Sequence, residues 1–503
     1  MLPLKTPLAR LAYSSLLRLA TPAYLLRLWL RGRREPAYRQ KWLQRLGFGE
    51  GALPTPGRLW LHAVSLGETR AAAPLIDALR AGHPGLRLLL THGTATGLEA
   101  GRALLREGDA QTWLPYDTPG AVRRFLRHHR PALGVVMETE IWPNLQLEAR
   151  AAGVPMVLAN ARLSPRSLRK GQQLAALMHP ALNAFTQVLA QTEADAQRLR
   201  DSGAQQVQVT GNLKFDMAPP PEQMARGRAW AAALRRPVVM AAATREGEET
   251  QLLVAWAAAL AAAPGTASAA SPASYPGVQA QPPSSEVRQA PPPLSQGAHA
   301  PPPSPQGRLA QPSSPQGRQA QPPSPQRRQA RPPCAEQRPL LLLVPRHPQR
   351  FDDVAALVQA SGLQLARRSD WGDEPPAAAH AADVWLGDSL GEMPLYYAAA
   401  QVALLGGSFE PLGGQNLIEA AACGCPLLMG PHTFNFAEAA EQAIEAGAAE
   451  RVPSLADAVP RAIELAASPL RLTMSAQGLD FAAQHRGAAQ RMAASILALP
   501  TSR

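Results

Sequence analysis

The chain has 503 residues, 46% of them apolar and only 5% aromatic, and a formal net charge of +12. It is longer than the roughly 100–200 residues of one domain, so at least two domains are expected. Residues 1–50 carry +8 (ten Lys and Arg, two Glu), residues 264–338 carry +5 (seven Arg, two Glu), and the remainder is near −1 (12 − 8 − 5). This uneven charge argues against a general nucleic-acid-binding face on the folded body.

The N-terminal segment, residues 1–50, is apolar but interrupted by Arg10, Arg18 and Arg27. Its longest uncharged run after the first residues, 19–26, is far shorter than the roughly 20 residues that span a bilayer. It also lacks the clean apolar core of a signal peptide. We expect a helix lying on a membrane surface or acting as a weak anchor. The basic residues favour the cytoplasmic side. The alternative is a helix packed on the protein's own body.

Residues 58–217 alternate between short apolar runs and helical patterns. Strands are predicted at 58–64, 86–93, 132–138, 154–161 and 187–192, with helices at 69–82, 94–105 and 142–153. Apolar runs of this length between helices are typical of a parallel sheet covered on both faces.

The same pattern returns in residues 236–262 and 339–495 and predicts a second doubly wound α/β domain. Its strands are expected at 236–244, 340–347, 383–388, 401–408 and 426–431, with a helix at 245–263. Residues 264–338 hold 19 of the 51 prolines and a ten-residue repeat. We expect them to form a disordered loop without a packed core, either a tolerated repeat expansion or a Pro-rich partner motif.

Ligands of open parallel sheets bind at the carboxyl ends of the strands. Glu68 follows the first strand at the start of a helix, where the helix dipole favours an ionised carboxylate. Glu138 ends another strand, and an extended chain would place Glu140 on the same face. Lys214 lies just before the second domain. Each also has an ordinary interpretation, namely a common helix-start glutamate, a solvated edge charge and a surface lysine.

The second domain offers two features that suit a phosphorylated ligand. Arg346 follows a strand and could grip phosphate, although it could equally be a surface residue. Two glycine pairs within residues 406–414 precede Gln415 and Asn416, which open a helix whose free N–H groups could bind an anion. Glu419, one turn later, could accept ribose hydroxyls. The alternative is a plain Gly-rich loop.

Several motifs are missing. The chain has no GxxxxGK[ST] P-loop and no HExxH. It has no Asp-x-Asp pair to hold a metal on a nucleotide diphosphate. The three cysteines, Cys334, Cys423 and Cys425, form neither a disulfide framework nor a metal-ligand spacing, which indicates a reducing compartment. We therefore expect neither a metal nor another cofactor.

Seven stretches of the chain together resemble the transferases of 3-deoxy-D-manno-octulosonic acid (Kdo) in lipopolysaccharide synthesis. The resemblance rests on WLHAVSLGETRAAAPL, METEIWPNL, NARLSPRS, TGNLKFD, PRHPQRF, LGDSLGEMPLYY and GGSFEPLGGQNLIEAAACGCPLLMGPHTFNF. They run in family order and cover nearly all of residues 10–500 except the Pro-rich insert, which is unusual for the family.

The resemblance implies a GT-B glycosyltransferase fold, in which two Rossmann-like doubly wound domains face a cleft. It implies a membrane-associated segment at 1–50, an acceptor domain at 51–220, and a donor domain at 221–503 interrupted by the insert at 264–338. The implied donor is CMP-Kdo, and the implied acceptor is the phosphorylated lipid A precursor (lipid IVA). The implied location is the cytoplasmic side of the inner membrane, and transfer would need no metal.

The resemblance also assigns roles to residues. Glu68 matches the general base of an inverting transfer, and Glu138 and Lys214 match groups that stabilise the transition state. The positions that match the CMP site are Pro345, Arg346, Leu390, Gly391, Glu392, Asn416, Leu417, Ile418 and Glu419. Two other functions stay open from the sequence alone. One is a GT-B transferase or epimerase acting on a UDP-sugar, and the other is an inactive membrane scaffold that recruits partners through its Pro-rich arm.

Overall fold

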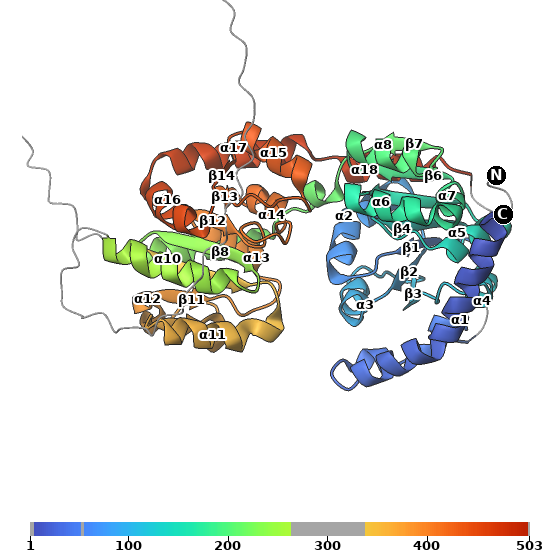
Figure 1. Cartoon of the computed structure of the whole chain (residues 1–503), viewed down its shortest axis with the longest axis horizontal. Coiled ribbons are helices and arrows are strands. Elements are labelled where there is room, and N and C mark those ends of the chain that lie inside the picture. Colours follow the sequence, from blue (N-terminus) through green and yellow to red (C-terminus); the bar gives the residue numbers. More distant parts are fainter. Residues whose placement is uncertain (1–4, 52–54, 263–337, 501–503) are drawn as a thin grey trace, which may run out of the picture. The chain divides into compact units, whose positions relative to one another are not determined.

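The computed structural model describes residues 5–51, 55–262 and 338–500. These residues form two parallel sheets of seven strands each, with helices on both sides of each sheet (Figure 1). The predicted pair of doubly wound α/β domains is confirmed. The Pro-rich segment expected at 264–338 lies, except for Arg338, outside the described residues.

The first sheet has the strand order β3-β2-β1-β4-β5-β6-β7. Its strands are β1 (Leu59–His62), β2 (Leu88–His92), β3 (Ala110–Trp113), β4 (Leu133–Met137), β5 (Met156–Ala161), β6 (Gln187–Ala190) and β7 (Val207–Val209). Its helices are α2 (Leu66–Gly82), α3 (Ala95–Arg102), α4 (Pro119–His129), α5 (Pro143–Ala151), α6 (Pro165–Gln173), α7 (Ala175–Leu182) and α8 (Glu193–Asp201). The order reverses between β1 and β4, which makes that junction the ligand-binding edge of this fold class.

The second sheet has the order β10-β11-β9-β8-β12-β13-β14 and reverses between β8 and β12. Its strands are β8 (Val238–Thr244), β9 (Leu340–Pro345), β10 (Leu365–Arg367), β11 (Val384–Leu386), β12 (Val402–Leu405), β13 (Leu427–Met429) and β14 (Ala449–Arg451). Its helices are α9 (Pro221–Leu234), α10 (Glu248–Ala262), α11 (Phe351–Ala360), α12 (Ala377–Ala381), α13 (Met393–Ala399), α14 (Leu417–Ala422), α15 (Ala437–Glu445), α16 (Leu455–Ala467) and α17 (Leu470–Gln484).

Both faces of each sheet are buried, so the central strands are mostly apolar, and their polar residues, such as His62 and Asn160, lie at or next to the strand ends. In β1, Leu59 and Leu61 point into one core and Trp60 points into the core on the opposite face. This alternation follows from the two-residue period of a strand. Polar chemistry is thereby confined to the strand ends.

The sequence missed four strands, β3, β7, β10 and β14, and each is an edge strand of its sheet. Edge strands are only half covered, and these are short and partly exposed. Their residues, such as those of β10 (Leu-Ala-Arg), do not form the continuous apolar run by which the other strands were found.

The last helix, α18 (Ala488–Leu497), packs on the first sheet, although the sequence assigned residues 221–503 to the second domain. Its apolar face joins the core that contains α2 residues Leu75 and Ile76, and Met492 lies within that core, fully buried. The prediction was wrong for this helix because its apolar spacing suits either sheet equally well.

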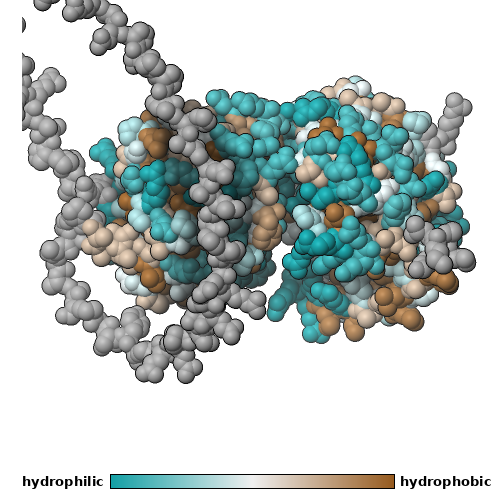
Figure 2. Space-filling model, turned by 45° about the horizontal axis from the view of Figure 1, so that its top comes forward, coloured by the Kyte–Doolittle hydropathy of each residue, from teal (hydrophilic) through white to brown (hydrophobic). Residues whose placement is uncertain are grey.

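The N-terminal helix α1 (Lys5–Arg31) runs beside α5 and α7 and is followed by two short 3₁₀ turns, η1 (Pro36–Arg39) and η2 (Trp42–Leu46). Within the described chain, none of the helices is long and apolar enough to cross a membrane. Brown, apolar residues reach the surface in patches among hydrophilic ones on the face shown in Figure 2. α1 contributes several exposed apolar side chains to the surface of the molecule.

The position of α18 gives a test of the fold. Met492→Ala should lower the free energy of unfolding by about 2–5 kcal/mol, because it leaves a cavity in a packed core. It should also speed amide hydrogen exchange in α2. Leu472→Ala, at a residue that is 59% exposed, is the control and should change stability by no more than about 0.5 kcal/mol. Unchanged exchange in α2 would contradict the packing of α18 on this sheet.

Candidate active site

Glu68 lies in the first turn of α2, which follows β1 at the junction where the strand order reverses. Ser65 caps the helix, its hydroxyl accepting a long hydrogen bond (3.4 Å) from the backbone N–H of Glu68. The Glu68 carboxylate in turn accepts hydrogen bonds from the Val64 N–H (2.8 Å) and from the Ser65 hydroxyl (3.2 Å). This Ser-x-x-Glu arrangement resembles a capping box, so Glu68 also stabilises its own turn.

The protonation of Glu68 differs from the expectation of a fully ionised carboxylate. Burial raises the pKa of Glu68 to about 7, against the Val64 hydrogen bond, and the neighbouring charges of Glu138 and Glu140 raise it further. Burial therefore outweighs the helix dipole. A carboxyl group with a pKa near neutrality is suited to take up a proton as a general base.

Glu138 is not a continuation of its strand. β4 ends at Met137, and Glu138 adopts a left-handed backbone conformation (φ 55°), which is uncommon for a residue with a side chain. The prediction that Glu138 and Glu140 share one face of an extended strand was therefore wrong. Such a strained conformation is typical of functional sites, where the surrounding structure holds it.

Two cations contact the Glu138 carboxylate, one at each oxygen. Lys214 Nζ lies 3.5 Å from Oε1, and Arg162 Nε lies 3.3 Å from Oε2. Glu138 itself is only 9% exposed. The structure thus brings the predicted pair Glu138 and Lys214 together, and it adds Arg162. Arg162 also donates from Nη1 to the backbone oxygen of Asn435 (3.2 Å).

Lys214 is held by the backbone of the 3₁₀ turn η3 (Leu213–Asp216). The Asn212 side chain accepts a hydrogen bond from the Lys214 N–H (3.0 Å), and the Asn160 side chain accepts one from the Leu213 N–H (3.1 Å). Asn160 is fully buried in β5 and also has a left-handed backbone (φ 51°). Through this hydrogen bond to Leu213, Asn160 at the end of β5 positions the backbone from which the Lys214 side chain extends.

Asn160 and Arg162 were not singled out from the sequence, although both lie in the stretch NARLSPRS. The signal was available, because a predicted strand at 154–161 ends there and the strand-end rule applies to it as well. Arg162 was overlooked because the long charged side chains of loops are usually solvated.

Glu140 lies in the same turn but is held differently. It accepts a hydrogen bond from the Trp142 indole (2.7 Å), and its Oε2 lies 3.9 Å from Nε2 of the fully buried His62. Burial raises the pKa of Glu140, and burial lowers the pKa of His62 to about 3. His62 is therefore neutral near pH 7. The Glu140 carboxylate beside it takes up a proton more readily than an exposed glutamate does.

In the second sheet, positive charge gathers at the ends of β8 and β9. Pro345 ends β9, and Arg346 follows it and donates to the Gln415 side chain (3.1 Å). Burial lowers the pKa of the adjacent His347, and the charges of Arg245 and Arg346 lower it further, while Glu246 raises it. Glu246 pairs with Arg245 (3.3 Å). Arg245, at the end of β8, was not predicted from the sequence. A cluster of guanidinium groups suits phosphate.

The glycine-rich turn after β12 is held by a buried glutamate, Glu248. Its carboxylate accepts hydrogen bonds from the N–H groups of Gly407 (2.8 Å) and Arg245 (2.9 Å). Gly407, Gly413 and Gly414 all have positive φ, which glycine adopts without strain. The turn is thereby fixed next to the arginine cluster.

The predicted helix start at Asn416–Glu419 is present, but the helix is short. Asn416 precedes α14, its side chain makes no cap, and its Oδ1 is buried without a hydrogen-bond partner in the described chain. Leu417 and Ile418 are fully buried in the core, so their side chains pack inside the domain and do not face a ligand. Burial raises the pKa of Glu419, while Arg70 and Arg346 lower it.

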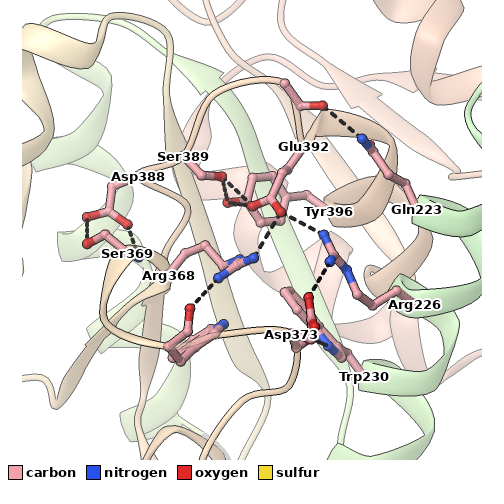
Figure 3. A network of polar contacts seen from close by, with 12 residues as sticks. Gln223, Arg226, Trp230, Arg368, Ser369, Asp373, Asp388, Ser389, Glu392 and Tyr396 are labelled. Carbon is pink, nitrogen blue, oxygen red and sulfur yellow. Dashed lines mark hydrogen bonds and ion pairs between the residues drawn. The ribbon is translucent and has the colours of Figure 1, made fainter.

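Glu392 has a structural role that the sequence did not indicate (Figure 3). Its Oε1 accepts hydrogen bonds from Arg226 (2.7 Å) and Arg368 (2.9 Å), and its Oε2 accepts one from the Ser389 hydroxyl (2.6 Å). Burial alone would raise the pKa of Glu392, but Ser389 and the two arginines more than offset this and lower it. The Glu392 carboxylate is therefore engaged by groups of the protein itself. These hydrogen bonds fix the loop before α13.

That loop presents the remaining predicted residues. Leu390 is 74% exposed, and Gly391 has a positive φ of 84°. The Gln223 side chain from α9 donates to the Gly391 backbone oxygen (3.2 Å). Leu390 and Gly391 are therefore accessible to a ligand, whereas the hydrogen bonds of Glu392 hold their loop in place.

Among the residues that the structure describes, no group of three or more His, Cys, Asp or Glu side chains is placed to hold a metal ion. Cys423 and Cys425 are both buried and free. Burial raises the pKa of Cys425 to about 12, so its thiol is inert.

Comparison with known proteins agrees with this arrangement. Residues 40–217 match the family model described as 3-Deoxy-D-manno-octulosonic-acid transferase (kdotransferase). The chain is 43% identical over 493 residues to a 3-deoxy-D-manno-octulosonic acid transferase of Bordetella pertussis, covering 96% of this chain and 98% of that protein. It is 31% identical over 490 residues to the transferase of the same name from Haemophilus influenzae, covering 96% and 97%.

A solved glycosyltransferase from Rickettsia africae has a similar fold. The TM-score is 0.51 at 10% sequence identity, and the match covers 88% of this chain and all of that one. At this identity the likeness concerns the fold alone.

The pKa of Glu68 gives a pH prediction. Activity should rise with pH through about 7, because only the deprotonated carboxylate accepts a proton. Since the folded-state pKa lies above the unfolded value near 4.5, the buried charge costs stability increasingly from about pH 4.5 to 7 and fully above it. Glu68→Gln should abolish activity yet unfold at a higher temperature than wild type at pH 8, with a smaller difference at pH 4.5.

The matched control is Glu99→Gln on α3, whose side chain is 70% exposed. It should leave both activity and the pH dependence of unfolding unchanged. Full activity of Glu68→Gln would remove Glu68 from the role of base.

Proposed function

Because the chain belongs to the family of 3-deoxy-D-manno-octulosonic acid transferases, we propose that it transfers Kdo from CMP-Kdo to the lipid A precursor (lipid IVA). Family membership confirms the glycosyltransferase activity expected from the sequence, as a step of lipopolysaccharide core synthesis. The observation that carries the mechanism is the buried Glu68 carboxylate, with a pKa of about 7, at the junction of β1 and β4. That is where this fold class binds ligands.

In the proposed reaction, an acceptor hydroxyl oxygen attacks the anomeric carbon of Kdo from the face opposite CMP. A carbon–oxygen bond forms, the bond from that carbon to the phosphate oxygen breaks, and CMP leaves with the electron pair. Glu68 takes the hydroxyl proton. Attack from the opposite face inverts the configuration.

Charged groups stabilise the two ends of this reaction. Arg346 and Arg245 are placed to balance the charge on the CMP phosphate, as a cation does for a leaving group. Lys214 can also balance the charge that builds on the leaving phosphate. Glu138, whose charge acts on Glu68, can stabilise the positive charge that develops on the sugar carbon or hold other groups in place. We propose that these side chains, with the backbone of Asn416–Glu419 and of Leu390–Gly391, carry out transfer without a metal ion.

The acceptor should bind on the first domain. An open groove of about 1240 Å³ runs along α2 and α3 and is lined by small apolar residues, among them Ala73, Ala78 and Ala100. Arg70 and Arg486 line it as well. An apolar groove with guanidinium groups suits an acylated, phosphorylated sugar. We place the donor on the second domain, beside the arginine cluster.

The N-terminal helix supports a location at the cytoplasmic face of the inner membrane. Some polar side chains of α1 face the protein, where Arg10 pairs with Glu148 (2.6 Å) and Tyr13 donates to Asp117 (2.9 Å). The exposed side of the helix carries large apolar residues, among them Leu8, Leu11, Leu16, Leu19, Leu26, Trp29 and Leu30, together with Arg18, Arg27 and Arg31. Exposed leucines with arginines among them suit a helix that lies in the membrane interface, where the long arginine side chains can reach water and lipid headgroups.

The first experiment is transfer from CMP-Kdo, made immediately before use, to tetra-acylated lipid A precursor in the presence of a chelator. Wild type should add Kdo, and CMP should inhibit it more strongly than UDP. Product mass would count the Kdo units. Inhibition by UDP rather than CMP, or transfer only from a UDP-sugar, would overturn the donor assignment. It would favour a GT-B transferase or epimerase that acts on a UDP-sugar.

A second experiment tests the membrane location. The double substitution Leu16→Asp and Leu19→Asp should reduce co-sedimentation with vesicles that contain anionic lipid, because charges replace apolar contacts with the interface. Leu472→Asp, at a comparably exposed leucine, should bind vesicles as wild type does. Equal binding by all three proteins would contradict a membrane role for α1.

A further inference from the structure

Arg162, Lys214 and Glu138 form a charge cluster that the proposed reaction does not fully use. The two ion pairs measure 3.3 and 3.5 Å, whereas charge-assisted hydrogen bonds are typically about 2.7–2.9 Å. Arg162 Nε is buried and has no hydrogen bond in the described chain. Among the same residues, Lys214 Nζ makes no hydrogen bond and lies over the Phe436 ring at 4.9 Å. Both cations are partly exposed, with side chains 38% and 17% accessible, so they have donors left for a further acceptor from solution.

The charge of the cluster leaves room for an anion. Two cations and one carboxylate carry a net charge of +1. The other ionisable groups close by are Glu68, Glu140 and His62. Burial raises the pKa of both glutamates and keeps His62 neutral near pH 7. Glu140 thus opposes the excess positive charge less than a fully ionised carboxylate would. Glu68 opposes it only while it is ionised, and it loses its charge when it takes the acceptor proton.

The transferred sugar supplies such an anion. Kdo is an acid, and its carboxylate is attached directly to the anomeric carbon that the acceptor attacks. When that carbon reaches the acceptor hydroxyl beside Glu68, the carboxylate must lie within one bond of it. An ionised carboxylate in a site that excludes water is costly unless it is paired. The planar guanidinium of arginine suits a carboxylate in particular.

We propose that Arg162 and Lys214 bind the carboxylate of the transferred sugar, and that Glu138 holds the two cations in position before the donor arrives. This deepens the proposed function and rests on it. Two residues with a left-handed backbone lie in this cluster: Glu138 itself, and Asn160, whose side chain accepts a hydrogen bond from the Leu213 N–H next to Lys214. Binding of CMP alone should not depend on Arg162, since the nucleotide lies on the arginine cluster of the second sheet.

The test compares the whole donor with the nucleotide alone. In the full-length enzyme, Arg162→Gln should raise the KM for CMP-Kdo by about tenfold or more, as expected for the loss of one charged hydrogen bond. The inhibition constant of CMP should change by less than about twofold, because CMP lacks the sugar acid. Arg162→Lys should bind CMP-Kdo more tightly than Arg162→Gln but less tightly than wild type. Lysine keeps the positive charge but lacks the paired N–H groups of a guanidinium.

The matched control is Arg166→Gln, at an exposed arginine of α6, four residues away. It should match wild type in both constants. If Arg162→Gln unfolds at a lower temperature, the comparison is made on Arg162→Lys, for which a raised KM with unchanged CMP inhibition is still expected.

Three results would overturn the proposal. An equal rise in the KM of CMP-Kdo and the inhibition constant of CMP would place Arg162 on the nucleotide. A rise only in the KM of the lipid acceptor would place it on the acceptor. An unchanged KM for CMP-Kdo would make it structural. Each differs from failure of the proposed function, in which wild type itself transfers no Kdo.

Discussion

The burial of both faces of each parallel sheet is the constraint on which the rest of this structure depends. A strand covered on both sides must be largely apolar, as β9 is along its whole length and β1 is up to His62. Groups that must stay charged can then lie only where the strands end. This is why Glu138 and Arg346 follow directly on buried strands, and why Glu68 lies in the first turn of the helix that follows β1. The topology gathers Glu68 and Glu138 at the junction where the order of the first sheet reverses.

The charges at that junction are adjusted by different means. Glu68 is partly buried, and this burial raises its pKa to about 7 although a backbone N–H and a hydroxyl donate to the carboxylate and lower it. Glu138 is buried as well, but it lies between Lys214 and Arg162. Two carboxylates in one site can thus have different roles, because one lacks a counter-ion and the other has two. Glu248 and Glu392 show a third use, in which a buried carboxylate accepts hydrogen bonds and fixes a loop.

The N-terminal helix α1 also presents different groups to the protein and to the surface. Arg10, Tyr13 and Ser14 are used inward, against Asp117, Asn144 and Glu148, and most of its leucines remain outside. The sequence offered two alternatives for this helix, a membrane surface and the protein's own body. The structure shows contact with the body, and the apolar face that remains is the basis for proposing the membrane as well. One helix can satisfy both interpretations, since each uses a different face.

The sequence by itself determined the two α/β domains, the ten inner strands and the residues that follow them, because an apolar run between helical patterns is a local property. It also indicated Glu68, Glu138, Lys214 and Arg346 through their positions after strands and through family resemblance. Only the tertiary structure decided what depends on contacts between distant segments. The edge strands β3, β7, β10 and β14 are strands because a neighbour pairs with them. The helix α18 belongs to the first sheet because its apolar face meets α2 there. Arg162 joins the site because β5 lies next to β4, and the carboxylate of Glu392 is occupied by arginines of other elements. Spacing along the chain cannot encode such contacts, since they arise only when the sheets assemble.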